Sequence, residues 1–310
     1  MRKIPAVLAV LSLSAVGLVG CSAPWSSSCQ RPADADPAVT DLITVEGDID
    51  AEPEVSLYTP FRIDATVVED LEVGEGTAIT TDAQLVVLDL TIVDGETGET
   101  VFASPYDGDL SSPFLLSGLV EDIPPLSDAL SCATEGTRTV VALPPGSVSP
   151  EVAASLEIGE DSSLVAVVDV RKVYLAAASG SLVFNSGFGL PAVVRAPDGS
   201  PGVVVPDSSA PTELVSQVLI RGEGEVVTGD QPVRVNILAV SWNDKTVTNT
   251  TWGAEPSSIS LDAAPDDFTA TLVGQTVGSQ LMVVNPAETE GGDAQIFVID
   301  ILGLDAPAAE

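Results

Sequence analysis

The sequence predicts an α+β fold in which one unit, an antiparallel sheet with one short helix across it, occurs twice in tandem. Three observations lead to this prediction. Apolar residues alternate over many short runs rich in Val, Leu and Ile, which is typical of β-strands. Candidate helices are few and short. Three blocks of sequence also occur in the same order in both parts of the chain, and such a repeat indicates a duplicated unit.

The three blocks match in residue type and in spacing. Each copy opens with a Gly-Glu-Gly triplet, followed after a fixed interval by an aspartate and an apolar strand. A block with a shared threonine and glycine comes next, and an alternating apolar strand with one aspartate closes each copy. The matching ranges are 74–82 with 222–230, 132–138 with 274–280, and 165–170 with 296–301. The alternative is two unrelated β-rich domains that share only strand alternation.

Composition bounds the function. The 310 residues suit two domains, and 45% of them are hydrophobic but only 4% aromatic, so the cores are expected to be aliphatic. The formal net charge is −35, which disfavours nucleic acid as a partner because the phosphate backbone is also negative. The chain contains no histidine, which excludes Ser-His-Asp and Cys-His catalysis and metal sites with histidine ligands.

The N-terminus has the pattern of an export signal. A basic start, Met1-Arg2-Lys3, precedes the apolar run Ile4–Val19, which is short for a membrane-spanning helix. The run ends at Cys21 in a sequence that resembles the lipobox of bacterial lipoproteins, in which the cysteine carries lipid and anchors the protein to a membrane. A plain secretory signal with an incidental cysteine is the alternative. We therefore expect a protein held on the extracytoplasmic face of the cell membrane.

Two more cysteines, Cys29 and Cys132, are expected to form a disulfide, because disulfides are common in exported proteins. In the chain-entropy model a loop of about 100 residues closed in this way contributes up to roughly 4–5 kcal/mol. Two buried free thiols are the alternative.

Domain boundaries follow from changes in composition. A polar stretch after Cys21 reads as a tether, and an Ala, Ser and Gly-rich stretch in the middle of the chain reads as a linker. The helix candidates are Pro125–Ala133 in the first copy and Asp266–Leu272 in the second. The expected divisions are 1–20 lipoprotein signal peptide, 21–38 tether, 39–175 first domain, 176–189 linker and 190–305 second domain.

The order of these blocks resembles the FKBP-type peptidyl-prolyl cis-trans isomerase domain, and most of all the two-domain actinobacterial lipoproteins of that family. The clearest motifs are Thr276-Val277-Gly278 and the closing strand Ile296–Leu302. The resemblance implies two tandem FKBP-like domains, each a curved antiparallel sheet wrapped around a short helix. It also implies an apolar pocket between helix and sheet that acts on X–Pro bonds of exported polypeptides, with no cofactor and no metal. The oligomeric state stays open.

Most pocket rings of the family are replaced in this chain. In the second copy the family's positions fall on Ile237, Val247, Phe268 and Val298, and Trp252 is a further candidate because it keeps a ring. The second copy is therefore expected to hold the better pocket. Phe268 as a plain core residue and Trp252 as cover for a sheet edge are the alternatives. The corresponding positions of the first copy are Asp89, Val101, Phe102, Ile123, Leu126 and Val167.

The replaced rings leave three functions open. The first is a peptidyl-prolyl isomerase of weak activity. The second is a peptide-binding or chaperone module that keeps the scaffold without catalysis. The third is a structural pair of β domains that spaces something from the membrane. A concave apolar pocket would favour the first two over the third.

Overall fold

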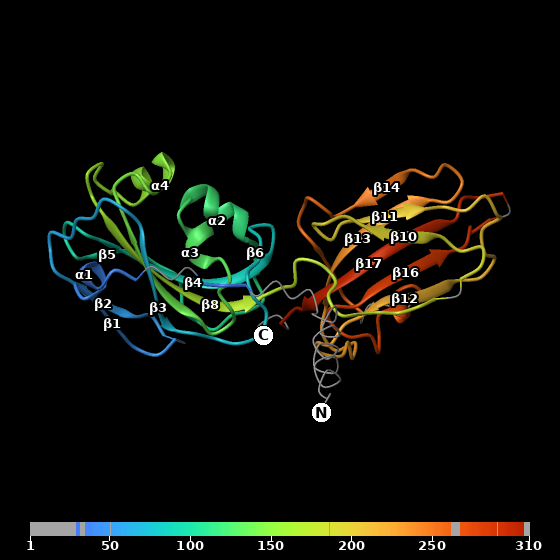
Figure 1. Cartoon of the computed structure of the whole chain (residues 1–310), viewed down its shortest axis with the longest axis horizontal. Helices are drawn as coiled ribbons and strands as arrows, with labels where there is room; N and C mark the ends of the chain where they lie inside the picture. Colours follow the sequence, from blue (N-terminus) through green and yellow to red (C-terminus); the bar gives the residue numbers. More distant parts are fainter. Residues whose placement is uncertain are drawn as a thin grey trace, which may run out of the picture. The chain divides into compact units, whose positions relative to one another are not determined.

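The computed structural model describes residues 29–31, 35–49, 51–185, 187–261, 267–289 and 291–306. The expected signal peptide and the lipidated Cys21 lie outside the described residues. From Arg31 onward the chain forms one compact unit that contains two large antiparallel sheets (Figure 1). The first sheet is built from residues up to Val173 and the second from residues after Gly180. The expected predominance of antiparallel sheet with few helices is confirmed.

The first sheet has six antiparallel strands, one of which, β6, pairs only with the start of β4. The long central strands are buried along nearly their whole length, which means that both faces of the sheet are covered. In spatial order the strands are β3 (Val67–Glu72), β7 (Arg138–Leu143), β8 (Leu164–Val173), β4 (Leu85–Asp94) and β5 (Thr100–Ala103), with β6 (Phe114–Leu115) beside β4.

Different elements cover the two faces of the first sheet (Figure 1). Helices α2 (Leu116–Asp122) and α3 (Leu126–Leu130) pack on one face. The hairpin of β1 (Ile43–Glu46) and β2 (Glu54–Leu57) packs on the other, after the short helix α1 (Pro37–Thr40). These faces are called the helix face and the hairpin face below.

The second sheet repeats the strand order of the first. Its strands are β12 (Val215–Arg221), β16 (Gln280–Asn285), β17 (Gln295–Leu304), β13 (Val233–Ser241) and β14 (Val247–Thr250), with β15 (Ser257–Ile259) beside β13 and β9 (Ser181–Leu182) outside β12. The hairpin of β10 (Ala192–Arg195) and β11 (Pro201–Val204) covers one face. On the other face, the described residues form one turn of 3-10 helix, η1 (Thr269–Thr271).

The two sheets also share their register. Asp89 lies opposite Asp169 in the first sheet, and Asn236 lies opposite Asp300 in the second. In both sheets the pairing shifts by one residue just beyond this pair, towards the start of β4 or β13. Asp169 and Asp300 therefore occupy the same position in the two sheets, as the sequence repeat predicts.

The repeated glycines have a steric cause. A Cβ atom on Gly74 would lie 1.8 Å from the carbonyl oxygen of Glu135, and one on Gly222 would lie 2.1 Å from that of Val277. Real Cβ atoms do not come that close to backbone, so only glycine fits at either position. The first block of the repeat thus marks a close crossing of backbones that is found in both sheets.

The carboxylate shared by both sheets has different partners in each. In the first sheet, Arg138 donates to both oxygens of Asp169 at 2.6 Å, and both side chains are buried. The same guanidinium donates to the carbonyl oxygens of Gly47, Asp48 and Ala51, at 2.7, 3.1 and 3.3 Å. Arg138 therefore ties the loop of the β1–β2 hairpin to the sheet.

In the second sheet a neutral side chain stands where Arg138 stands in the first. The amide of Gln280 donates to Asp300 at 2.7 Å, and the backbone N–H of Ala178 donates to its other oxygen at 2.7 Å. Burial raises the pKa of Asp300 above its ordinary value, as it does for Asp169, although these two hydrogen bonds and the charge of Arg195 act in the opposite direction.

The ends of β8 and β17 are joined by direct contacts. The hydroxyl of Tyr174 donates to Asp305 at 2.8 Å, and Lys172 Nζ donates to the carbonyl oxygen of Leu304 at 2.6 Å. The ring of Tyr174 lies where a Cβ on Gly303 would come within 2.6 Å of it, so glycine is required there too. Leu85 and Leu302 complete this small apolar cluster, in which Tyr174 is buried.

Several elements differ from the sequence predictions. The helix expected over residues 125–133 forms as α3, but α2 and α4 (Pro150–Ser155) were not predicted. Of the helix expected over residues 266–272 only η1 is helical among the described residues. The expected linker 176–189 contains β9, which pairs with β12 and so belongs to the second sheet.

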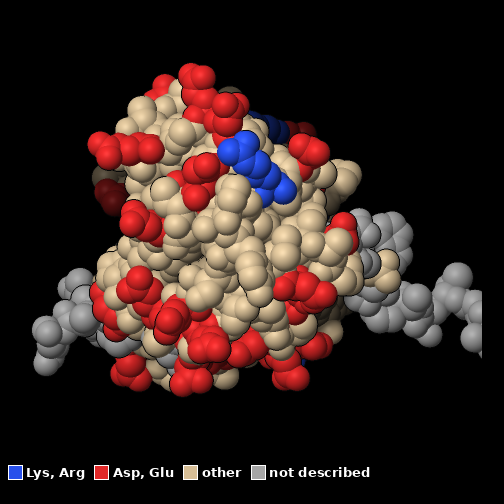
Figure 2. Space-filling model, turned by 90° about the vertical axis from the view of Figure 1, so that its left-hand side faces the viewer, with Lys and Arg blue, Asp and Glu red and all other residues tan. Residues whose placement is uncertain are grey.

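Cys29 and Cys132 are both disulfide-bonded in the structure. Carboxylates are spread over the face seen in Figure 2, with few basic groups between them, as the net charge of −35 requires. Among the residues that the structure describes, no helix is both long and apolar enough to cross a membrane.

Candidate functional site

An apolar cavity of about 210 Å³ lies on the helix face of the first sheet, where the sheet meets α2 and α4. Its volume is below the roughly 300–1,000 Å³ of sites that hold drug-sized ligands, so it suits one side chain better than a cofactor. The residues that line it are Leu90, Ile92, Phe102, Leu119, Asp122, Ile123, Val152, Ser155 and Leu156.

The spacing of these residues along each strand and helix places their side chains on the side that faces the cavity. Leu90 and Ile92 are two residues apart on β4 and therefore share its helix face. Phe102 on β5 pairs with Ile92 across the sheet and is 40% exposed, so its ring forms part of the mouth. Leu119 and Ile123, four residues apart on and just after α2, lie on one face of that helix.

Helix α4 closes the remaining side. Ser149 caps it by accepting a hydrogen bond from the backbone N–H of Val152, and Pro150 occupies the first turn, where it needs no hydrogen-bond partner. Val152 and Leu156, four residues apart, then face the cavity. The chain segment between β7 and β8 is thereby folded over the pocket.

The chemistry that this lining offers is apolar. Its polar side chains are Asp122 and Ser155, and the hydroxyl of Ser155 already donates to the carbonyl oxygen of Val152 at 3.0 Å. Asp122 accepts from the hydroxyl of Ser149 at 3.1 Å. No group of three or more potential metal ligands occurs within the described residues. The cavity can exclude water and hold an apolar ring, and it presents no nucleophile paired with a base.

The first-copy positions named from the sequence divide between the two faces. Phe102 and Ile123 line the cavity, whereas Leu126 is buried in the core behind it. Val101 also packs against that core. Val167 lies on the hairpin face. The remaining position, Asp89, is bonded to Ser104 at 2.8 Å and does not line the cavity.

The five second-copy candidates are not brought together. Phe268 and Ile237 pack on the helix face of the second sheet, whereas Val298 and Trp252 pack on its hairpin face. Val247 is 58% exposed on the edge strand β14. Because the sheet separates the two groups, these residues do not share one cavity. The expectation that the second copy holds the better pocket is not supported by this arrangement.

Phe297 was missed by the sequence analysis. It packs on the helix face of the second sheet, and its ring meets that of Phe268 edge to face, with centroids 4.9 Å apart and planes at 64°. The neighbouring residue Val298, chosen from the sequence, points to the opposite face because successive strand residues alternate. The signal was present in the sequence as the alternation of the closing strand.

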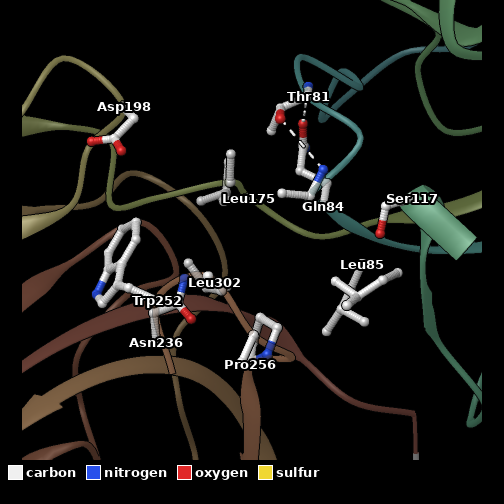
Figure 3. A pocket seen from close by; sticks show the side chains of 15 residues that line it. Thr81, Gln84, Leu85, Ser117, Leu175, Asp198, Asn236, Trp252, Pro256 and Leu302 are labelled. Atoms are coloured by element: carbon white, nitrogen blue, oxygen red, sulfur yellow. Dashed lines mark hydrogen bonds between the residues drawn. The ribbon is translucent and has the colours of Figure 1, made fainter. Parts of the chain in front are cut away.

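Trp252 lines a separate hollow of about 390 Å³ between the first and second sheets. Figure 3 shows Trp252, Asp198 and Asn236 on one side of it, and Gln84 and Ser117 on the other. The lining mixes polar and apolar groups from both sheets. Trp252 Nε1 is buried and has no hydrogen-bond partner among the described residues.

A third hollow lies beside Phe268, lined by Glu213, Leu214, Asp267 and Glu288 among others. Trp252 is not part of it, so Trp252 and Phe268 line different hollows. Of the hollows at Phe102, Trp252 and Phe268, the one at Phe102 combines an apolar lining with the position between helix and sheet that the sequence resemblance implies.

No family model matches the chain, and no curated protein matches it. Among solved structures, the chain is similar to the three FKBP domains of wheat FKBP73, at 14% identity over 77% of this chain and 94% of that chain, with a TM-score of 0.30. It is also similar to FkpA from Escherichia coli, at 22% identity over 40% and 55% of the two chains, with a TM-score of 0.28.

A peptidyl-prolyl cis-trans isomerase from Pseudomonas syringae is 18% identical over 30% of this chain and 76% of that chain, with a TM-score of 0.26. TM-scores of 0.30 and below are too low to carry a conclusion about fold or function. The inferences that follow therefore depend on the residues and geometry described above.

Proposed function

We propose that this chain is an FKBP-like, exported peptidyl-prolyl cis-trans isomerase of weak activity, and that its site is the cavity at Phe102. The observation that carries the proposal is the position of this cavity, between the helix and the sheet, together with its nearly complete apolar lining. The sheet that holds it has the antiparallel order and helix cover that the sequence resemblance implies. Proline-containing segments of exported polypeptides are the proposed substrates.

Isomerisation of an X–Pro bond does not require the catalytic groups that are missing from the lining of the cavity. Rotation about an X–Pro bond has a barrier of about 18–20 kcal/mol because amide resonance is lost on the way. A dry pocket disfavours the planar, more polar amide relative to the twisted one, so it lowers that barrier without a base, a nucleophile or a metal. Phe102 would hold the proline ring, and Leu90 and Leu119 would keep water from the amide.

A matched pair of phenylalanines tests the proposal. Phe102 and Phe114 are 40% and 37% exposed, and both lie on short strands that pair with β4. Only Phe102 lines the cavity. Exchange of a proline-containing peptide between cis and trans is measured by NMR with the chain as catalyst. We expect Phe102→Ala to lower kcat/KM about tenfold, the loss of one ring contact, and Phe114→Ala to leave it unchanged.

A rate equal to the uncatalysed rate for the unsubstituted chain would exclude the enzyme and leave the fold as described. Equal rates for the two alanine variants would exclude the cavity as the site.

The second candidate is a peptide-binding module without catalysis. The observation that favours it is the single aromatic ring of the cavity, since each missing ring removes a large contact area with a bound proline. Titration of labelled peptide followed by fluorescence anisotropy, with Phe102→Ala as the variant, distinguishes it. Binding that depends on Phe102, without acceleration of isomerisation, would support this module.

The proposed location is the outer face of the cell membrane, with a lipid on Cys21, and the proposed disulfide partner of Cys29 is Cys132. Mass spectrometry of the mature N-terminal peptide tests the first point, since an acylated cysteine adds the mass of its lipid. An unmodified Cys21 would remove the anchor. Peptide mapping without reductant tests the second, because a pair of peptides linked through these cysteines should appear.

A further inference from the structure

Three large apolar side chains are almost fully exposed to solvent within one short segment that begins in β9. Leu182, Phe184 and Phe188 are 84%, 94% and 106% exposed. Two of the seven phenylalanines of the chain are thus presented to solvent within five residues. Scattered exposed apolar residues are normal, but such a group marks a surface that meets an apolar partner.

The segment is held in place, so the exposure is not that of a loose chain. β9 pairs with β12 at the edge of the sheet, and beyond it the backbone N–H of Val183 donates to Leu219 at 2.9 Å. The side-chain amide of Asn185 donates to the carbonyl oxygen of Val218 at 2.6 Å. Because successive side chains along an extended chain point to opposite faces, Leu182 and Phe184 share the face opposite to that of Val183.

The charge around the segment is unusual for this protein. The chain carries 46 acidic residues in 310, yet none lies between Val170 and Pro197. Arg221 is exposed and lies opposite Ser181 in the register. Further along β12 the neighbours of the segment are uncharged, since Gln217 is the side chain nearest to Gly187.

The carboxylate of Asp207, near the end of the segment, is paired. Ser208 donates to the carbonyl oxygen of Gly189 at 3.2 Å, and the residue before it, Asp207, forms an ion pair with Lys245. The segment that carries the exposed rings thus has no carboxylate of its own, on a protein whose net charge is −35.

We propose that Leu182, Phe184 and Phe188 form a contact surface for a phospholipid bilayer. Their side chains have no hydrogen-bonding groups to satisfy and would insert at the boundary between headgroups and acyl chains. The lack of acidic residues removes the repulsion that the rest of this surface would meet at an anionic membrane. The inference rests on the proposed membrane location and is independent of the isomerase activity.

Depth-dependent fluorescence quenching tests it. The full chain is reconstituted into vesicles of phosphatidylcholine and phosphatidylglycerol with brominated acyl chains, and the emission of the unsubstituted chain is subtracted. We expect the tryptophan introduced by Phe184→Trp to lose about half its emission, as for a ring about 5–10 Å deep in the interface. The control is Val73→Trp, at a 72% exposed position just after β3, which should keep its emission.

A second variant guards against quenching caused by anchoring alone. Adding Leu182→Asp and Phe188→Asp to the Phe184→Trp chain should restore its emission, because the two carboxylates oppose insertion. Equal quenching at positions 73 and 184, or quenching that survives the two aspartates, would overturn the inference. Flotation of the chain with the vesicles is recorded separately. A chain that floats while Phe184→Trp stays unquenched would overturn the contact surface and leave the membrane anchor intact.

Discussion

Asp169 and Asp300 occupy the same position in the two sheets but have different hydrogen-bond partners, Arg138 and Gln280. Replacing each aspartate by asparagine should therefore have opposite effects on stability. Asp169→Asn leaves the guanidinium of Arg138 buried without its counter-charge. Removing one partner of a fully buried ion pair typically costs about 3–5 kcal/mol of unfolding free energy. The three carbonyl oxygens that also accept from Arg138 offset part of this cost, so we expect a loss of about 3 kcal/mol, near the lower end of that range.

Asp300→Asn removes a buried charge whose hydrogen-bond donors are the neutral amides of Gln280 and Ala178. The amide of Gln280 can turn to accept from the new asparagine, while the asparagine oxygen keeps the bond from the Ala178 N–H. We therefore expect Asp300→Asn to raise the free energy of unfolding at neutral pH. The two variants should differ by at least about 3 kcal/mol, which corresponds to several degrees in Tm.

The effect of Asp300 should depend on pH. Burial raises its pKa in the folded protein, so the folded state binds this proton more tightly than the unfolded state does. The stability contributed by Asp300 is then full below the unfolded pKa of about 3.9 and is lost as pH rises through the folded pKa. The advantage of Asp300→Asn should consequently be small near the unfolded pKa and grow towards neutral pH.

Urea unfolding followed by circular dichroism at several pH values measures the stability change of each asparagine variant and its dependence on pH. Hydrogen exchange in β8 and β17 locates each effect. Equal destabilisation by both asparagine variants would refute the reasoning, because it would mean that the neutral partner Gln280 and the cationic partner Arg138 are equivalent. An Asp300→Asn advantage that does not change with pH would refute the role of the buried charge.

Two further predictions concern close contacts. Gly74→Ala and Gly222→Ala should each lower the unfolding free energy by more than about 2 kcal/mol, since the new Cβ would overlap backbone. Gly118→Ala in α2, where nothing lies within 4 Å of the new Cβ, should raise the unfolding free energy by up to about 1 kcal/mol. Thermal unfolding of the three variants checks this order of stability, and equal effects would contradict it. Tyr174→Phe should cost about 1 kcal/mol by removing the donor to Asp305, and an unchanged Tm would show that this bond adds nothing.

The repeat in the sequence predicted the repeated sheet because the matching residues have the same structural role in each copy. Gly74 and Gly222 are fixed by close backbone crossings, and Asp169 and Asp300 by shared register. Such positions tolerate few substitutions, so the two halves carry identical residues there although they differ elsewhere.

The candidate site was harder to place, since the central strands are buried on both faces. Where both sides of a strand are apolar, alternation gives no sign of which residue faces the helix. An offset of one residue then exchanged Leu90 for Asp89 and Phe297 for Val298, and each exchange selects the opposite face. Trp252 and Phe268 lie in turns outside the strands, so strand alternation gave no sign of the faces that they cover.

Helix α4 shows a signal that could have been used. Ser149, Pro150 and Glu151 form a typical helix start, and recognising it would have placed Val152 and Leu156 over the cavity. Helix α2 carries no such signal, because its N-cap residue makes no side-chain hydrogen bond and Gly118 lowers its helix propensity. Packing against the sheet, which the sequence does not display, stabilises it.

The contact between Tyr174 and Asp305 joins residues separated by 131 positions in the chain. During synthesis from the N-terminus, the first sheet is complete well before Gly303 and Asp305 emerge. The side chains of Tyr174 and Leu85 therefore stay exposed to solvent until β17 has been synthesised and has paired. A chain truncated before Gly303 would leave the ring of Tyr174 without the glycine against which it packs.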